Sequence, residues 1–453
     1  MNRDRLLAMP LWRAVFVLGF PQAIGLAAHA SVNLVDLMLV GRLGADAVAA
    51  AHVATTINFL PMLLGHGFSI ATLSLLSRQL GSGDHSAARA LNNQAQVLAL
   101  VLGIVVSVST TLPAAWCVDT VELPAAARQD AIHYLIVSNL GCLPMFAMMQ
   151  ATTAMRAVGE VRMPLLLLLG ANLLNLVLDV LLLYGWSAIG LPAFGVVGAA
   201  YATVISRAAA ALAGYLWLMR EESLLRLSWR RRRRKPLFGA LLGMAVPQVA
   251  QVALRAGLIW GLTVAAQRLG GPDTVAALGI TTRLDTVILF AAAGFGAAAT
   301  TLAGRHLASG QAALARRAGL WAAAQSFLFA AGVVGLLWLL RVPLVGWFVP
   351  DPPAGLLQRV RDYLAVAALA HPLTAFALAA VGAVHGSGRM LPPLAVDLAC
   401  FAVIGTALAW VVTTARPLAD AYWVIVLGSA LVALGQWLLL ARGRWARGAA
   451  ATR

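Results

Sequence analysis

Residues 14–44 read AVFVLGFPQAIGLAAHASVNLVDLMLVGRLG, an apolar run long enough to cross a lipid bilayer as one helix. About 20 mainly apolar residues suffice for a single crossing. Eleven further runs of this kind follow along the chain, bounded by Gly, Pro and charged residues. The spans predicted in this way are 14–40, 47–76, 93–117, 130–155, 164–185, 195–219, 237–267, 275–303, 318–348, 359–383, 391–414 and 420–441. The sequence therefore predicts an all-α polytopic membrane protein.

The composition supports this class. Of 453 residues, 61% are hydrophobic and 11% are charged, and the mean hydropathy is +0.84. Soluble proteins are about 45–50% apolar and about 25% charged. The formal net charge of +16 could suggest nucleic acid as a partner. The basic residues lie mostly between the apolar runs, however, so they indicate contact with a lipid surface and no nucleic-acid partner.

The distribution of basic residues predicts the orientation. With the N-terminus in the cytoplasm, 23 of the 33 basic residues fall on the cytoplasmic side, and the other ten lie in outer segments or within spans. Cytoplasmic loops of membrane proteins carry the excess of Arg and Lys. Both termini are therefore expected in the cytoplasm and the protein in a bacterial inner membrane. The charged N-terminus leads into the first span without a small-residue cleavage site, so we expect no removable signal peptide.

The chain contains an internal repeat. Pro21-Gln22 recurs as Pro247-Gln248, and RQLGSGD at 78–84 recurs as RHLASGQ at 305–311. Each half has six predicted spans and so enters the membrane from the same side. The halves are therefore expected to form two six-helix bundles related by a pseudo-two-fold axis along the membrane normal. The predicted organisation is an N-terminal lobe at 1–219, a basic cytoplasmic linker at 220–236, a C-terminal lobe at 237–441 and a cytoplasmic tail at 442–453.

Two acids stand out inside the predicted spans of the first half. Asp36 and Asp179 each lie about five residues, or roughly 7 Å, below the outer end of their helices. Asn33 precedes Asp36 by three residues and Asn175 precedes Asp179 by four, so each amide shares a helix face with its acid. Ionisable groups in a bilayer are costly, and this pattern favours a proton-binding site. A sodium ion held by the same oxygens is an alternative.

The repeat offers an internal control for these residues. The second-half positions that match Asp36, Asn33 and Asp179 hold Leu262, Ile259 and Thr406. A six-helix bundle therefore does not need the acids for its assembly. This favours a function for them over structural hydrogen bonding.

Further residues allow both a functional and a structural interpretation. His29 lies two turns below Asp36 and could relay a proton, or could satisfy a backbone carbonyl. Pro21 interrupts the first helix and could act as a gating hinge, or as a packing kink shared with Pro247. Arg207 could be a counter-charge to an acid or form an interhelical structural bond.

Two charged residues of the second half are expected to form a pair. Arg255 and Asp285 lie at roughly 18 Å and 15 Å below the outer surface, on neighbouring helices. Similar depth predicts an ion pair between them. Asp397, near the cytoplasmic end of its helix, is expected to snorkel or to cap.

Several motifs resemble those of a known family. They are Pro21 followed by Asp36 in a first helix that ends VGRLG, then SRQLGSGDHSAA at 77–88, MRAVGEVRMP at 155–164 and NLLNLVLD at 172–179. In order and spacing they resemble the multidrug and toxic compound extrusion (MATE) family over nearly the whole chain. The resemblance implies two six-helix bundles that exchange drugs or metabolites for protons or sodium ions.

The resemblance also implies site residues. Family members with a site in the N-terminal lobe use an Asp in helix 1 and an Asn and an Asp in helix 5, which here are Asp36, Asn175 and Asp179, with Thr203 on helix 6 as a neighbour. Sodium-coupled members of one branch carry two acids in the C-terminal lobe. Arg255 and a threonine stand at those positions here, which argues against a sodium site in that lobe.

The sequence thus predicts a secondary antiporter that exports small amphipathic, often cationic, compounds in exchange for protons, with sodium as an alternative at Asp36, Asn175 and Asp179. No nucleotide-binding or hydrolase motif occurs, so we expect neither an enzyme nor a cofactor beyond the coupling ion, and no obligate protein partner beside substrate and membrane lipids. One alternative is a lipid-linked saccharide flippase of the same superfamily. A membrane-embedded lipid-modifying enzyme is another, although no nucleophile or metal-binding His accompanies the acids.

Overall fold

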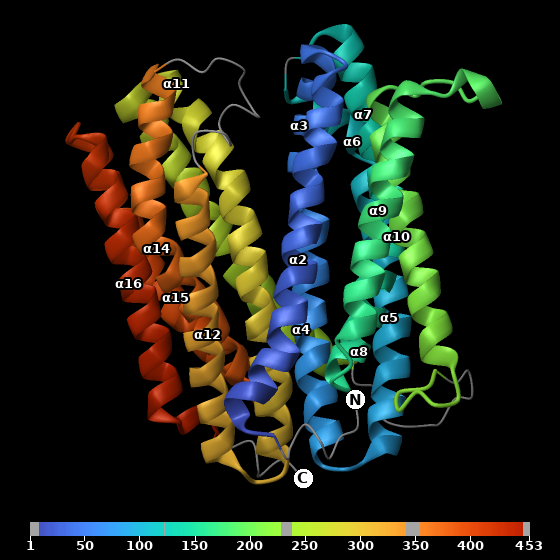
Figure 1. The fold of residues 1–453 in the computed structure, drawn as a ribbon, viewed down its shortest axis with the longest axis vertical. Helices are drawn as coiled ribbons and strands as arrows, with labels where there is room; N and C mark the ends of the chain where they lie inside the picture. The colour runs from blue at the N-terminus through green and yellow to red at the C-terminus, as the bar shows by residue number, and fades with distance from the viewer. Residues whose placement is uncertain (1–8, 122, 228–237, 341–353, 447–453) are drawn as a thin grey trace. The chain divides into compact units, whose positions relative to one another are not determined.

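The computed structural model describes residues 9–121, 123–227, 238–340 and 354–446. Within these ranges the regular secondary structure is helical, apart from one isolated β-bridge between Trp186 and Leu191 (Figure 1). The α-helices are α2 (Leu11–Gly41), α3 (Ala45–Ile57), α4 (Phe59–Gly81), α5 (His85–Thr111), α6 (Ala114–Asp119), α7 (Ala125–Leu140), α8 (Cys142–Ala157), α9 (Arg162–Tyr184), α10 (Val196–Met219), α11 (Phe238–Ala308), α12 (Ala312–Leu339), α14 (Ala354–Gly386), α15 (Leu391–Thr413) and α16 (Leu418–Arg442). Two short 3₁₀ helices complete the elements, η1 (Ser187–Ile189) and η2 (Arg444–Ala446).

Twelve helical segments of the described chain are long and apolar enough to span a membrane, which confirms the predicted number. The eighth predicted span, 275–303, falls within the second helical segment of α11, which follows Gly271. The basic tract of the predicted linker, 230–235, and residues 447–453 of the predicted tail lie outside the described residues.

Helix α11 consists of two helices joined at a glycine. Gly271 has φ 72° and ψ −171°, which is not helical, and the segments on either side form separate candidate spans. Only glycine adopts this backbone region without a steric penalty. The two spans are therefore joined by a single left-handed residue.

The helices group into two compact units. We call the one formed by Ala28–Thr72 and Asp84–Ala245 the N-terminal unit, and the one formed by Met1–Ala27, Leu73–Gly83 and Val246–Arg453 the C-terminal unit. The units are not simple halves of the sequence, because α2, α4 and α11 each contribute residues to both.

The N-terminal unit packs α9 against α10, α5 against α8 and α3 against α7. One of its apolar clusters joins Ala50, Leu135 and Val196, which come from α3, α7 and α10. Helix α5 begins with a side-chain cap, because the Asp84 carboxylate accepts a hydrogen bond from the Ala87 N–H at 2.8 Å. The pairing of α9 with α10 places Asn175 beside Thr203 and Arg207.

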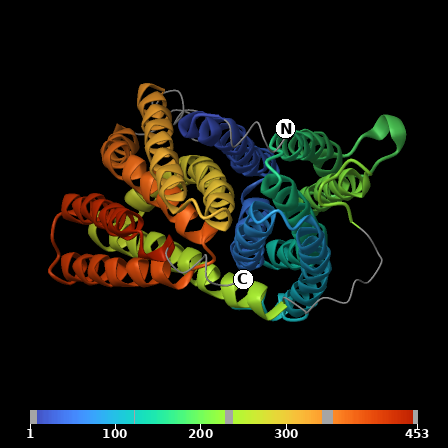
Figure 2. The ribbon, with the colours of Figure 1, turned by 90° about the horizontal axis from the view of Figure 1, so that it is seen from below.

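The C-terminal unit packs α14 against both α12 and α16, and α15 against α16 (Figures 1 and 2). Small residues let its helices approach closely. A Cβ atom on Gly382 of α14 would lie 2.1 Å from the carbonyl oxygen of Gly296 on α11. Thr300 donates a hydrogen bond to the Gly382 carbonyl at 2.9 Å across the same contact. Close packing of this kind replaces the hydrophobic effect as the source of helix association in lipid.

Candidate functional site

The two acids predicted in the first half meet in the N-terminal unit. Asp36 of α2 and Asp179 of α9 bring their carboxyl groups within hydrogen-bonding range of one another. Asp179 is fully buried and Asp36 is half-buried. Among the described residues, no N–H or O–H donates to either oxygen of Asp179 or to Oδ1 of Asp36. The two carboxyls can therefore bond to each other only when one of them carries a proton.

Arg207 of α10 supplies a positive charge to the same place. It lines a cavity together with Asp36 and interacts with that carboxylate electrostatically. A guanidinium keeps its charge under all ordinary conditions. The structure therefore supports the interpretation of Arg207 as a counter-charge to the acids.

The predicted polar neighbours also lie here. Asn175 of α9 is buried and its amide donates to the Thr203 hydroxyl of α10 at 3.5 Å. Ser206, one turn further along α10, donates to the Thr203 carbonyl at 3.0 Å. The cavity is lined by residues from α2, α8, α9 and α10, which are His29, Asp36, Met148, Ala171, Asn172, Asn175, Thr203, Ser206 and Arg207.

The size of this cavity restricts what it can hold. It encloses about 20 Å³, which is room for one water molecule or a small cation. Pockets for organic ligands measure about 300–1,000 Å³. The cavity therefore fits a proton site with a water or an ion site, and it does not fit a drug in this conformation.

His29 is held by an amide of the next helix. Its Nδ1 lies 3.2 Å from the side chain of Asn172 on α9. With the Asn172 amide turned so that every contact pairs a donor with an acceptor, its NH₂ group donates to His29 Nδ1 and to the Leu168 carbonyl. Nδ1 then acts as an acceptor, so the imidazole that faces this cavity is neutral.

Pro21 is not part of this arrangement, because it lies inside α2 but within the C-terminal unit. The side chain of Asn33 lies outside the described residues. The sequence analysis missed Asn172 and Ser206. Asn172 could have been found, because it precedes Asn175 by three residues and thus shares the helix face that carries Asn175.

In the C-terminal unit, the predicted pair of Arg255 with Asp285 is wrong. Arg255 of α11 donates instead to Asp397 of α15 at 3.1 Å, and Gln436 of α16 donates to the other oxygen of Asp397 at 2.7 Å. Asp397 is fully buried and does not snorkel. Helical rise gives depth but not the direction in which a side chain points, and a fully buried carboxylate needs a partner.

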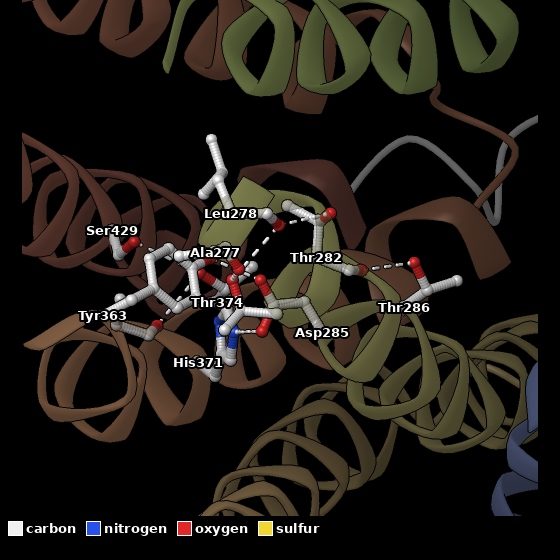
Figure 3. A network of polar contacts seen from close by, with 11 residues as sticks. Ala277, Leu278, Thr282, Asp285, Thr286, Tyr363, His371, Thr374 and Ser429 are labelled. Atoms are coloured by element: carbon white, nitrogen blue, oxygen red, sulfur yellow. Dashed lines mark hydrogen bonds and ion pairs between the residues drawn. The ribbon is translucent and has the colours of Figure 1, made fainter. Parts of the chain in front are cut away.

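Asp285 binds two residues of α14. His371 Nε2 lies 2.6 Å from Oδ1 of Asp285, and the Tyr363 hydroxyl donates to Oδ2 (Figure 3). Nowhere in the described ranges do three or more His, Cys, Asp or Glu side chains gather as ligands for a metal ion.

A chain with twelve candidate spans, a buried carboxyl pair and an amide-lined cavity has the features of a membrane transporter, because ionisable groups at this depth mark ion or substrate pathways. The chain belongs to the MatE family, whose model matches residues 21–181 and 247–411. Each match covers most of one sequence repeat. Family membership makes the chain a transporter and not an enzyme.

Relatives of this family resemble the chain over most of its length. A probable multidrug resistance protein NorM of Deinococcus radiodurans is 28% identical, over 89% of this chain and 88% of the length of that protein. The probable multidrug resistance protein YpnP of Bacillus subtilis is 26% identical over 86% of both chains. A protein of Shewanella oneidensis described as an FAD transporter is 25% identical over 88% of this chain and 87% of its own.

Solved structures share the fold. An outward-facing multidrug resistance MATE family transporter of the MOP superfamily matches with a TM-score of 0.89, at 21% identity over 98% of both chains. A MOP superfamily transporter from Pyrococcus furiosus matches with a TM-score of 0.88 at the same identity and coverage. At this identity the likeness establishes the fold alone.

Proposed function

We propose that this chain is an antiporter of the bacterial inner membrane that exports small amphipathic, often cationic, compounds in exchange for protons. Asp36 and Asp179 are the proton-loading groups. Asn175, Thr203 and Arg207 surround them. Both termini face the cytoplasm, as the excess of basic residues in the predicted cytoplasmic segments indicates.

One observation carries this proposal. The buried oxygens of Asp179 face the Asp36 carboxyl and receive no hydrogen bond from any described donor. Two desolvated carboxylates in contact repel one another, whereas one shared proton removes a charge and supplies the missing hydrogen bond. The pair is thus built to bind and release a proton.

The charges of the site suit exchange for a cation. With one shared proton, the net charge of Asp36, Asp179 and Arg207 is zero. Loss of that proton leaves one negative charge in a low-dielectric surrounding, which favours binding of a cationic compound elsewhere in the same unit. Proton and substrate therefore compete electrostatically without sharing the small cavity.

Transport follows when this competition differs between conformations. Coupling requires that proton and substrate are not both favoured in one state. A proton loaded from outside displaces the substrate, and release of the proton to the cytoplasm restores the charge. Each proton that enters down a potential of 100 mV supplies about 2.3 kcal/mol.

Sodium is the alternative coupling ion. The oxygens of Asp36, Asn175 and Thr203 are hard ligands, and the cavity has the volume for one small cation. Arg207 lines that cavity and repels a cation placed inside it. This arrangement favours the proton.

The relatives support the class of substrate. Two of them are described as probable multidrug resistance proteins and one as an FAD transporter, so the substrate panel should include organic cations and FAD. A saccharide-lipid flippase would need a strongly cationic path, whereas 23 of the 33 basic residues lie in the predicted cytoplasmic segments. A lipid-modifying enzyme is not supported by family membership.

Export in proteoliposomes tests the proposal. With an imposed proton gradient, wild-type protein should export a fluorescent organic cation, and Asp36→Asn and Asp179→Asn should each lose gradient-driven export. Asp119→Asn, on an exposed residue between spans, is the control and should export normally. Full export by both site variants, or a requirement for sodium in the wild type, would refute proton loading at this pair.

A further inference from the structure

A second titratable cluster lies inside the C-terminal unit, formed by Asp285 of α11 and by Tyr363 and His371 of α14. All three residues are buried, with 7–8% of each residue's surface exposed. Both oxygens of Asp285 are occupied, because Oδ2 accepts from the Tyr363 hydroxyl and Oδ1 lies 2.6 Å from His371 Nε2 (Figure 3). The cluster therefore has a defined hydrogen-bonding pattern, which fixes where a proton can go.

The chemistry leaves two charge states. With Asp285 ionised, Nε2 of His371 must carry a hydrogen in order to donate to Oδ1. The imidazole is then neutral while Nδ1 is unprotonated, and the cluster has a charge of −1. A proton added at Nδ1 makes the cluster neutral and leaves both hydrogen bonds to Asp285 in place. Protonation of His371 at Nδ1 therefore breaks neither hydrogen bond to Asp285.

Among the charged side chains that the structure describes near this cluster, His371 is the one that pairs with Asp285. Arg255 is engaged by Asp397, and Arg359, one turn before Tyr363, donates to Thr274. Helix α16 contributes Tyr422, which packs edge-to-face against Tyr363 at 6.1 Å, and Asp362 and Arg359 both interact with Tyr422 electrostatically. Among the described side chains, no arginine forms an ion pair with Asp285, so the charge of the cluster depends on the imidazole.

The internal repeat argues that this cluster is not needed for bundle assembly. At the offset of 227 that relates Gly159 to Gly386, the positions of Tyr363 and His371 correspond to Ile136 and Pro144. The first half thus forms its helices without this histidine and tyrosine. Ionisable groups buried in membrane spans are costly, so a function is expected for them. Imidazole is the side chain that changes charge in the physiological pH range.

We propose that Asp285, His371 and Tyr363 form a second proton-binding site, which loads one proton on the imidazole independently of Asp36 and Asp179. Its contribution to transport rests on the proposed antiport, where it adds a proton to the exchange. Pro372 directly follows His371 inside α14, and a proline within a helix removes a backbone hydrogen bond. A change of charge at His371 thus occurs beside an interruption in the hydrogen bonding of its helix.

The site can be tested on full-length protein in nanodiscs without substrate. Between about pH 8 and pH 5, the range in which histidine changes charge, the Asp36→Asn protein should take up about one proton more per molecule than Asp36→Asn with His371→Gln. Gln keeps a donor for Asp285 but cannot gain a proton. His306→Gln is the matched control, because that ring bonds the uncharged amide of Gln311, and it should leave the His371 proton in place.

Nitrogen NMR of histidine-labelled wild-type protein observes this ring directly, and His371→Gln serves only to assign its two resonances. The two resonances lost in His371→Gln should show a protonated Nε2 at every pH and a titrating Nδ1. Equal proton uptake with and without His371, or an Nδ1 that stays unprotonated to about pH 5, would overturn the proposal. The proposal would also be overturned if sodium stabilised the protein and Asp285→Asn abolished this stabilisation. Because substrate is absent and Asp36 is already replaced, these outcomes are independent of the test of antiport.

Discussion

Arg255 donates to Asp397 at 3.1 Å and thereby ties α11 to α15 inside the C-terminal unit. The carboxylate is fully buried and the arginine side chain is 23% exposed. Removal of either partner leaves the other charge uncompensated, at a cost of about 3–5 kcal/mol.

We predict that Arg255→Ala and Asp397→Ala each lower the thermal stability of the purified protein, and that the double variant recovers part of the loss. Fluorescence-monitored melting of the four proteins forms a double-mutant cycle. Arg255→Ala combined with Asp285→Ala is the control and should show additive losses. If the Arg255–Asp285 double variant recovers stability and the Arg255–Asp397 double variant does not, then Arg255 pairs with Asp285, as their similar depth predicted.

The contact between Gly382 and Gly296 gives a second prediction. A Cβ on Gly382 would meet a carbonyl oxygen at 2.1 Å, whereas one on Gly332 of α12 meets nothing within 4 Å. Gly382→Ala should therefore destabilise the protein by about 1–3 kcal/mol, as overpacking does. Gly332→Ala should leave the melting temperature unchanged or raise it. Equal melting temperatures for the two variants would show that α11 and α14 do not pack as described.

A third prediction concerns an exposed ion pair between spans. Arg128 donates to Asp119 through two nitrogens at 2.6 and 3.0 Å, and this hydrogen bonding lowers the pKa of the Asp119 carboxyl. A carboxyl with a depressed pKa stabilises the fold above its unfolded pKa, and the effect is lost as pH falls through the folded value.

Wild-type protein should therefore melt slightly above Asp119→Asn at neutral pH, and the difference should vanish in strong acid. High salt should also reduce it, because the pair is exposed. A difference that grows on acidification would contradict the pairing.

Topology is open to a direct test. In a Cys-free variant, a cysteine at Glu222 of the predicted cytoplasmic linker should be shielded from an impermeant thiol reagent in intact cells. A cysteine at Val121, in a predicted outer loop, should react. The opposite labelling pattern would invert the orientation.

The number of spans could be predicted from sequence because each helix needs about 20 apolar residues, and this signal is independent of packing. The proximity of Asp36 and Asp179 could also be predicted from the sequence. Their equal depth, their polar companions on the same helix face and the absence of these residues from the second repeat can all be read along the chain.

The partners of the second half could not be predicted. Arg255 and Asp285 have compatible depths, but the sequence does not state how far each helix is rotated or which neighbour it faces. Asp397 was assigned to the lipid interface because it lies near a helix end, yet Gln436 of α16 covers it. His371 was overlooked because a single histidine within an apolar run carries no periodic signal.

The shared proton of Asp36 and Asp179 is most directly tested by proton release. On addition of a cationic substrate to purified, weakly buffered wild-type protein, a pH indicator should report about one proton released per substrate bound, since site charge and substrate charge balance. Asp36→Asn should release none, and its affinity for the substrate should no longer depend on pH. Undiminished proton release from both Asp36→Asn and Asp179→Asn would show that the coupling proton is bound elsewhere.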